Sequence, residues 1–259
     1  MNSRIQHHAR ARALASADSV RSGPFVLRYN RGWASPFANY AIPDDGAAPT
    51  ADDVTALIDA FRERDRLPRL EYLPSCAPLV EAALLAAGLT VENRVIVMAC
   101  TAETLVAPDS SPGVVCREPD GEGEFLAAAL VQHLGYGGAA DAEGVEEAAR
   151  GADRLHATAA DGGFVALAAT GTPNDVGTVV GTGTCTPPLD GLSELVGLAV
   201  DSDFRRCGIA AALAAHLTAA ALTGGCRLVW LEPGDADIQR IYARIGYRAV
   251  GEKLNISLR

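Results

Sequence analysis

The residues best suited to chemistry lie in one short turn, Arg205-Arg-Cys-Gly-Ile-Ala210, between an apolar strand sequence and a long apolar helix sequence. A glycine-containing turn that opens a helix presents unpaired backbone N–H groups, and the positive end of the helix dipole adds to their attraction for anions. Arg205 and Arg206 supply forked donors that suit phosphate oxygens. The turn therefore predicts a site for a phosphate or pyrophosphate, although a surface arginine pair beside an ordinary glycine turn is the competing explanation.

Regular elements surround this turn. Apolar runs and helical spacing predict a strand, a helix, a strand and a helix in succession, followed by closing strands over 247–258. These four elements cover 194–200, 208–222, 227–231 and 238–245. Upstream, the pattern predicts strands at 114–117, 163–170 and 177–184 and helices near 122–133 and 142–152. The alternation of types indicates a mixed α/β (α+β) domain.

The first hundred residues have a similar but shorter pattern. We expect helical structure around 9–17, strands at 25–29, 37–42, 70–73 and 91–100, and helices at 51–64 and 77–87. Residues 107–113, Ala-Pro-Asp-Ser-Ser-Pro-Gly, have the composition of a linker. The chain is therefore expected to contain two lobes.

The two halves suggest an internal repeat. Arg69-Leu-Glu-Tyr-Leu73 and the later Gly88 correspond to Arg227-Leu-Val-Trp-Leu231 and Gly246 at one constant offset of 158 residues. The helices that precede these strands, 51–64 and 208–222, also correspond. Sequence identity between the halves is low, so a chance similarity of two αβ units is the alternative.

The second half resembles the GNAT family of N-acetyltransferases. Arg205, Gly208 and Ala210 match the family signature (Q/R)-x-x-G-x-(G/A), and Asp235-x-x-Ile-x-x-Ile-Tyr242-x-x-x-Gly246-Tyr is similar to its N-x-x-A-x-x-L-Y-x-x-x-G-F motif. Both motifs stand at the family's separation and in its order of elements over residues 113–259. The resemblance implies an acyl-CoA N-acyltransferase fold with a mostly antiparallel central sheet flanked by helices.

The resemblance also implies acetyl-CoA as co-substrate, with its pyrophosphate in the arginine–glycine turn and its pantetheine arm along the preceding strand. The implied cofactor contacts come from Leu198, Ala199, Val200, Arg205, Arg206, Cys207, Gly208, Ile209, Ala210, Asp235 and Tyr242. Asp235 replaces the family's usual asparagine, which puts its own contact in doubt. No metal is expected.

Acyl transfer to an amine requires removal of a proton, stabilisation of an oxyanion and protonation of the leaving thiolate. Tyr242 matches the family tyrosine that donates to the sulfur, and backbone N–H groups of 198–200 match the oxyanion donor. Glu194 and Glu232, at strand ends beside the expected opening, are both candidate bases, and the choice between them stays open. His133 and Tyr136 are candidate acceptor contacts, the alternative being a loop without a special role.

The N-terminal lobe resembles the second half of the same fold but lacks the phosphate turn, since residues 46–51 read Gly-Ala-Ala-Pro-Thr-Ala. Leu84 stands where the repeat has Tyr242. We therefore expect a degenerate lobe that binds no cofactor. The expected organisation is an N-terminal extension (1–23), a partial lobe (24–106), a linker (107–113) and a complete catalytic domain (114–259).

The composition of the chain favours some classes of binding partner over others. The chain has a formal charge of −10, which disfavours nucleic acid and anionic membranes and favours a cationic acceptor. Its six cysteines form no C-x-x-C pair, and no signal peptide or membrane span is visible, so a cytoplasmic protein is expected. The expected oligomeric state is a monomer or a homodimer. The sequence thus predicts transfer of an acetyl group to a primary amine of a small molecule. The alternatives are another acyl-CoA or acceptor, and a non-catalytic CoA-binding regulatory module.

Overall fold

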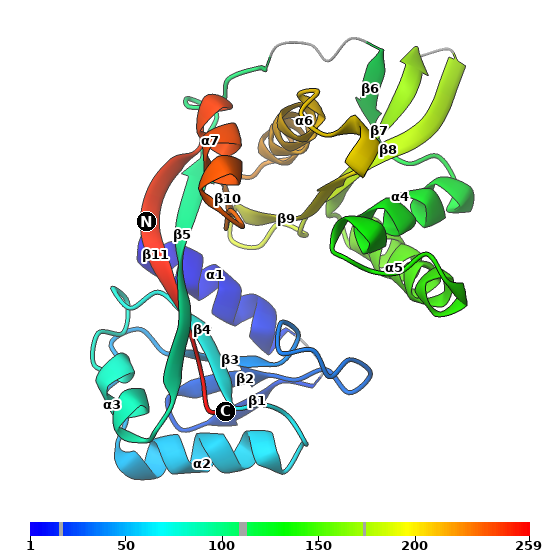
Figure 1. The fold of residues 1–259 in the computed structure, drawn as a ribbon. Helices are drawn as coiled ribbons and strands as arrows, with labels where there is room; N and C mark the ends of the chain where they lie inside the picture. Colours follow the sequence, from blue (N-terminus) through cyan, green and yellow to red (C-terminus); the bar gives the residue numbers. More distant parts are fainter. Residues whose placement is uncertain (16–17, 109–112, 173–174) are drawn as a thin grey trace. The chain divides into compact units, whose positions relative to one another are not determined.

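The computed structural model describes residues 1–15, 18–108, 113–172 and 175–259 and divides the chain into two compact units (Figure 1). Unit 1 comprises Met1–Val97 and Ala249–Arg259, and unit 2 comprises Met98–Arg248. Four residues of the predicted linker, 109–112, lie outside the described residues. Within the described ranges, no helix is both long and apolar enough to cross a membrane.

Unit 1 is built on strands in the order β1-β2-β3-β4-β11-β5. Its elements are α1 (Asn2–Leu14), β1 (Val20–Ser22), β2 (Phe25–Arg28), β3 (Tyr40–Pro43), α2 (Ala51–Arg62), β4 (Arg69–Tyr72), α3 (Val80–Ala86), most of β5 (Thr90–Cys100) and the greater part of β11 (Arg248–Ser257). β3 and β4 are parallel, whereas β1–β2, β2–β3 and β4–β11 are antiparallel. The strand–helix–strand order agrees with the sequence pattern, and the structure adds that the two strands are parallel.

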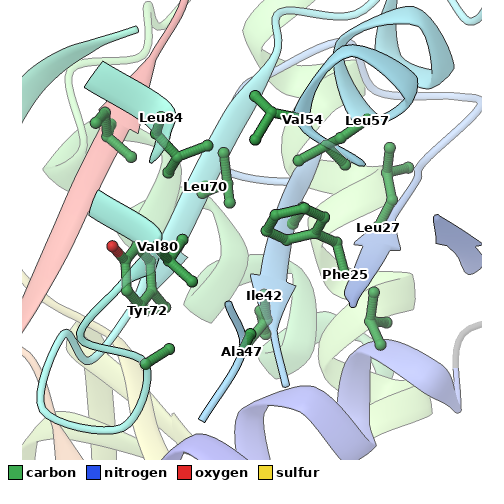
Figure 2. Packing of buried hydrophobic residues seen from close by; sticks show 14 of the residues in the cluster. Phe25, Leu27, Ile42, Ala47, Val54, Leu57, Leu70, Tyr72, Val80 and Leu84 are labelled. Carbon is green, nitrogen blue, oxygen red and sulfur yellow. The ribbon is translucent and has the colours of Figure 1, made fainter. Parts of the chain in front are cut away.

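The core of unit 1 follows from the spacing of apolar residues in α2. Val54, Leu57, Ile58 and Phe61 recur at helical intervals and are all buried. Figure 2 shows Val54 and Leu57 in the same apolar cluster as side chains of β2, β3, β4 and α3. At the start of α2, Thr50 forms a capping box that satisfies the first backbone donors of the helix.

Unit 2 has the strand order β10-β9-β8-β7-β6, with the end of β5 beside β10. Its elements are β6 (Val114–Arg117), α4 (Glu122–Gly135), α5 (Ala142–Ala160), β7 (Phe164–Thr172), β8 (Asp175–Cys185), β9 (Leu192–Val200), a short 3₁₀ helix (Ser202–Phe204), α6 (Ile209–Thr223), β10 (Leu228–Leu231) and α7 (Ala236–Arg244). Among the strand pairs that the structure describes in this unit, only β9–β10 is parallel. The parallel pair β9–β10, joined through α6, therefore repeats the parallel pair β3–β4, joined through α2, of unit 1.

Two helices are longer than the sequence suggested. α1 begins at Asn2 rather than near residue 9, because its polar residues contact the unit: the Gln6 side-chain oxygen accepts a hydrogen bond from the Leu73 N–H at 2.8 Å. α5 continues to Ala160 rather than ending near 152, because Leu155 is buried against α4 and β7. Tertiary contacts thus extend helices through sequences with few apolar residues.

The closing strands are exchanged between the two halves of the chain. Met98–Cys100 of β5 pair antiparallel with β10, and Leu254–Ser257 of β11 pair antiparallel with β4. Each compact unit therefore takes a strand from the other half of the sequence. For this reason the predicted lobe of 24–106 and domain of 114–259 do not coincide with units 1 and 2.

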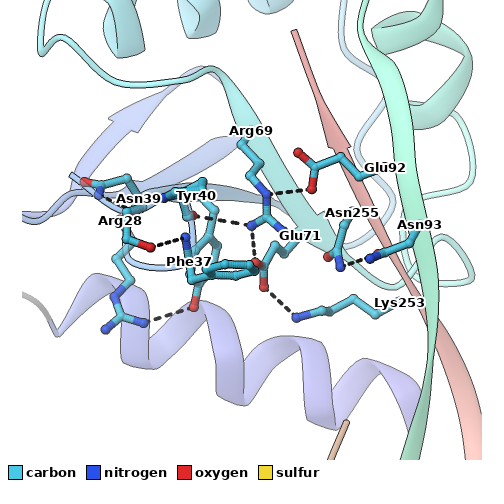
Figure 3. A network of polar contacts seen from close by, with 12 residues as sticks. Arg28, Phe37, Asn39, Tyr40, Arg69, Glu71, Glu92, Asn93, Lys253 and Asn255 are labelled. Carbon is cyan, nitrogen blue, oxygen red and sulfur yellow. Dashed lines mark hydrogen bonds and ion pairs between the residues drawn. The ribbon is translucent and has the colours of Figure 1, made fainter. Parts of the chain in front are cut away.

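A buried ionic network lies on the sheet of unit 1 (Figure 3). The Arg69 side chain is 2% exposed, its Nε donates to Glu92 Oε2 at 2.9 Å, and its Nη1 pairs with Glu71. Lys253 on β11 places its Nζ 2.5 Å from the other Glu71 oxygen. The Phe37 ring lies over the guanidinium, with its centroid 5.3 Å from Arg69 Cζ. Glu71 is therefore held between two cations.

These two cations lower the pKa of Glu71 although burial opposes them. A carboxyl whose pKa is lowered by folding stabilises the fold above its unfolded-state pKa of about 4.3, and this contribution is lost as the pH falls through the folded-state pKa. We expect Glu71→Gln to lower the free energy of unfolding by about 3 kcal/mol at pH 7 and by progressively less below pH 4. Urea unfolding of both proteins across this pH range measures the difference.

Glu252→Gln is the matched control, because Glu252 pairs with Arg94 at a side-chain exposure of 46%. Exposed pairs of this kind contribute about 0–1 kcal/mol. A difference between wild type and Glu71→Gln that stays constant from pH 7 into the acid range would contradict the role assigned to the Glu71 carboxylate.

Candidate functional site

The turn between β9 and α6 has the backbone of an anion site. Asp201 follows β9 directly, and its carboxylate accepts a hydrogen bond from the Asp203 N–H at 2.9 Å. Arg206 and Gly208 both have left-handed backbone conformations, with φ of 62° and 82°. Gly208 is the N-cap of α6 and adopts at little cost a conformation that strains most side chains. The chain thereby reverses sharply and begins α6 at Ile209.

The N-terminus of α6 is open. No side chain caps it, and its first turn contains no acidic residue. The first N–H groups of a helix have no intrahelical acceptor, so those of Ile209 and Ala210 are available to an external anion. Arg205 is exposed and donates from Nε to the Val200 carbonyl at 3.3 Å, while the Cys207 thiol bonds the Arg205 carbonyl at 3.5 Å. These features fit a pyrophosphate.

The corresponding helix of unit 1, α2, is closed by its own side chains. The Asp53 carboxylate accepts hydrogen bonds from the Thr50 N–H at 2.8 Å and from the Thr50 hydroxyl at 2.7 Å. These bonds lower the pKa of Asp53, so the carboxylate is ionised at neutral pH. A negative charge at this helix terminus repels a phosphate. The two lobes thus differ at the position where the sequence predicts a difference.

β9 carries a bulge beneath the last turn of α4. β9 pairs with β8 as Thr182↔Ala199 and as Thr184↔Val196, so the register shifts by one residue between these pairs. Gly197 lies in the shifted segment with φ of 64°. A Cβ on Gly135 of α4 would lie 2.8 Å from the Ala199 Cβ, so α4 rests closely on this face of β9. A glycine inside a strand is a recognised signal of such a bulge.

Glu194 lies on the face of the sheet that α4 covers. Val196 and Ala199 share this face, because their partners on β8 are two residues apart and side chains alternate along a strand. Glu194 precedes Val196 by two residues and pairs with Trp230, which is the last pair of the β9–β10 ladder. Glu232 follows β10 directly, with its Oε1 shielded from solvent. Both candidate bases therefore stand where the two parallel strands end their pairing.

Tyr242 is buried in α7 with 7% of its surface exposed. Its ring packs against that of Tyr247, with centroids 5.7 Å apart, and the Tyr247 hydroxyl shares a 2.7 Å hydrogen bond with Thr218 of α6. Burial raises the pKa of Tyr242 well above 10, and the nearby Tyr136 phenol raises it further. Tyr242 is consequently protonated at neutral pH and can act as a proton donor.

The two predicted acceptor contacts have different surroundings. Tyr136, the C-cap of α4, directs its hydroxyl to the Leu198 carbonyl at 3.5 Å and interacts electrostatically with Tyr242. His133 lies 3.1 Å from the Ala139 carbonyl through Nε2 and holds the connection between α4 and α5. The structure thus brings Tyr136 to the candidate site and gives His133 a local structural role.

Asp235 acts as the N-cap of α7. Its Oδ1 accepts hydrogen bonds from the N–H groups of Asp237 and Ile238, both at 2.8 Å. This explains why an acid is accepted at the position of the family asparagine, since both residue types cap helices well. A contact between Asp235 and the cofactor stays a prediction.

Sequence reasoning did not identify Gln132 of α4. Its Nε2 donates to the Gly197 carbonyl at 2.7 Å, within the bulge of β9. Gly197 itself was a detectable signal, as a glycine inside an apolar strand sequence. Among the described residues, no group of three or more His, Cys, Asp or Glu side chains gathers in a way that could hold a metal ion.

The sequence profile of the family described as "Acetyltransferase (GNAT) family" matches residues 135–247, which include β9, the turn, α6 and Tyr242. Residues 135–247 form a GNAT acetyltransferase domain. This match confirms the predicted resemblance. A search of curated protein sequences gave no match.

Solved structures resemble the whole fold around this GNAT domain. A GCN5-related N-acetyltransferase from Kribbella flavida has a TM-score of 0.79 and 23% identity over 99% of this chain and 95% of its own. A tandem GNAT protein from the clavulanic acid biosynthesis pathway has a TM-score of 0.59 and 15% identity, covering 92% and 81%. A functionally unknown conserved protein from Staphylococcus epidermidis has a TM-score of 0.61 and 14% identity, covering 94% and 95%. These similarities confirm the predicted acyl-CoA N-acyltransferase fold.

Proposed function

We propose that this protein transfers the acetyl group of acetyl-CoA to a primary amine of a small molecule, by direct attack in a ternary complex. The observation that carries the proposal is the contrast between the two helix N-termini. α6 begins at a left-handed glycine with two arginines and no cap, whereas the Asp53 carboxylate closes α2. An anion-accepting terminus inside a GNAT domain supports a single acyl-CoA site, formed by unit 2.

The residues around this turn suit the three requirements of amine acylation. Glu194 or Glu232 removes a proton from the bound ammonium, directly or through water, so that the amine can attack the thioester carbon. Backbone N–H groups of the 198–200 segment stabilise the oxyanion of the tetrahedral intermediate. As the intermediate collapses, the carbon–sulfur bond breaks and Tyr242 gives its proton to the leaving thiolate. The nitrogen gives up its second proton to water, and water returns a proton to the Tyr242 phenolate, so that the net reaction releases the one proton taken up by the glutamate. The products are an amide and coenzyme A.

The acceptor is expected to approach from the side of α4. Glu194 lies on this face of the sheet and Tyr136 stands at its edge. The net charge of −10 favours a cationic amine over an anionic one through long-range attraction. Polyamines, aminoglycosides, amino acids and peptide N-termini form the panel of acceptors that we would compare.

We expect isothermal titration calorimetry to find one acetyl-CoA site per chain, and a thiol-release assay over the amine panel to find amine-dependent production of coenzyme A. The physical reason for the stoichiometry is the ionised Asp53 carboxylate at the start of α2. Two sites per chain would contradict the proposed closure of the N-terminal lobe. Binding without amine-dependent thiol release from any acceptor would instead favour a non-catalytic CoA-binding module.

A further inference from the structure

We propose that Gln132 is a positioning residue that sets the backbone of the β9 bulge for acyl transfer, an inference that rests on the function proposed above. Its Nε2 donates to the Gly197 carbonyl at 2.7 Å. A Cβ on Gly197 would lie 2.2 Å from the same nitrogen, so a side chain at this position would displace the Gln132 amide from the carbonyl. A long polar side chain from α4 therefore holds one specific carbonyl of β9.

The contact belongs to a continuous helix face. Gln132, Gly135 and Tyr136 are spaced i, i+3 and i+4, so they occupy the same side of the last turn of α4. Gln132 binds the Gly197 carbonyl, Gly135 lies against Ala199, and the Tyr136 hydroxyl reaches the Leu198 carbonyl at 3.5 Å. This turn of α4 thereby contacts three successive residues of β9.

The geometry of a peptide group connects this contact to the chemistry. In a trans peptide the C=O of one residue and the N–H of the next point in opposite directions, and no cis peptide bond occurs among the described residues. When Gln132 draws the Gly197 carbonyl toward α4, the Leu198 N–H must point away from α4. Leu198 is among the predicted oxyanion donors, so Gln132 fixes the direction in which this donor is presented.

Gly197 makes such a restraint necessary. Its φ of 64° lies in a region that glycine enters freely, and glycine also has a wide choice of other conformations. Without a partner for its carbonyl, the peptide between Gly197 and Leu198 can rotate and turn the carbonyl toward the developing oxyanion. A stabilising donor would then be replaced by a repelling acceptor.

The test compares Gln132→Met and Gln132→Glu with wild type, using the most active amine and saturating acetyl-CoA. Neither replacement can donate to the Gly197 carbonyl at neutral pH, and the carboxylate also repels it. We expect kcat to fall about 10–100-fold, which is part of the 10²–10³-fold effect of losing one oxyanion donor. The Kd for acetyl-CoA should change less than about 3-fold, because the turn at Arg205–Ala210 is untouched.

Leu134→Gln is the matched control, since Leu134 lies in the same turn of α4 but is 39% exposed. It should retain wild-type kcat. An unchanged kcat in both Gln132 variants would overturn the proposal. So would a loss of kcat that merely parallels a lower melting temperature and a weaker acetyl-CoA Kd, because that pattern indicates general structural damage.

A second readout does not require turnover. In ¹⁵N-labelled protein we expect the Leu198 amide to exchange faster, and to shift less on addition of acetyl-CoA, in Gln132→Met than in wild type. If the wild type acetylates no amine, the proposed function fails while this measurement still tests the restraint. Identical Leu198 exchange and shifts in the two proteins would overturn the positioning role by itself.

Discussion

Tyr242→Phe is expected to lower kcat by about 10²–10⁴-fold while the Kd for acetyl-CoA stays nearly constant, because general acid catalysis by a positioned side chain contributes an effect of this size. The substitution removes one oxygen from a ring that is 93% shielded, so the packing against Tyr247 is preserved. Steady-state kinetics with the most active amine and calorimetry with acetyl-CoA separate the two quantities.

The pH dependence gives an independent check on Tyr242. Burial and the neighbouring Tyr136 raise its pKa above 10, so the phenol stays protonated throughout the range in which the enzyme can be assayed. We therefore expect no decline of wild-type kcat between pH 7 and about 9.5 from ionisation of Tyr242. An alkaline decline in that interval that disappears in Tyr242→Phe would show that the phenol titrates there.

Tyr247→Phe is the matched control for this experiment. Tyr247 is fully buried and loses a 2.7 Å hydrogen bond to Thr218, so the variant should be destabilised by about 1–2 kcal/mol. Its hydroxyl has no part in the proposed chemistry, and kcat should stay within about 3-fold of wild type. If both tyrosine variants lost activity equally, the proton-donor role of Tyr242 would be untenable.

Local sequence signals predicted most of the elements around the site. The turn from Arg205 to Ala210, the apolar strand before it and the helix after it follow from glycine chemistry and from the length of the two apolar runs. The same signals failed for α1 and for the second half of α5, because these segments are held by Gln6 and Leu155 through contacts with distant residues. Sequence patterns predict the structure that neighbouring residues favour, and they miss structure that depends on contacts with distant residues.

The repeat shows a second limit of sequence reasoning. At the offset of 158 residues, Tyr72 corresponds to Trp230, yet the two side chains face differently. Tyr72 packs with Val80 and Leu84 of α3 (Figure 2). Trp230 instead pairs with Glu194, which lies on the face covered by α4. A shift of one residue reverses the face of a whole strand, and low sequence identity cannot locate such a shift.

The exchange of closing strands was equally beyond the sequence. Both strands become buried over their last four residues, 97–100 of β5 and 254–257 of β11, so their burial patterns do not distinguish one partner strand from the other. Which partner each strand joins depends on the geometry of the complete chain. Composition placed the boundary between the lobes at 107–113. The compact units instead follow the pairing of strands, so that residues 249–259 belong to unit 1.

Gly208→Asp is expected to weaken acetyl-CoA binding by about 10³-fold. It places a carboxylate where the pyrophosphate is proposed to bind, and two like charges about 4 Å apart near a protein surface repel by about 4 kcal/mol. The change places a carboxylate at the N-cap of α6, so that the N-terminus of this helix carries a negative charge as the N-terminus of α2 does through Asp53 at its N3 position. Calorimetric titration with acetyl-CoA measures the loss, and Arg205→Ala should give a smaller one, about 10–100-fold, from one lost charged donor.

Gly208→Asn separates the charge from the backbone. Asparagine has nearly the shape of aspartate and is among the few side chains that accept a left-handed conformation, which Gly208 requires at φ of 82°. Its effect on the Kd should stay below about 10-fold, and its melting temperature should match that of Gly208→Asp. Equal loss of affinity in both variants would assign the effect to backbone strain. Unchanged affinity in both variants and in Arg205→Ala would mean that the anion binds elsewhere, because a carboxylate at this helix terminus must repel a pyrophosphate bound there.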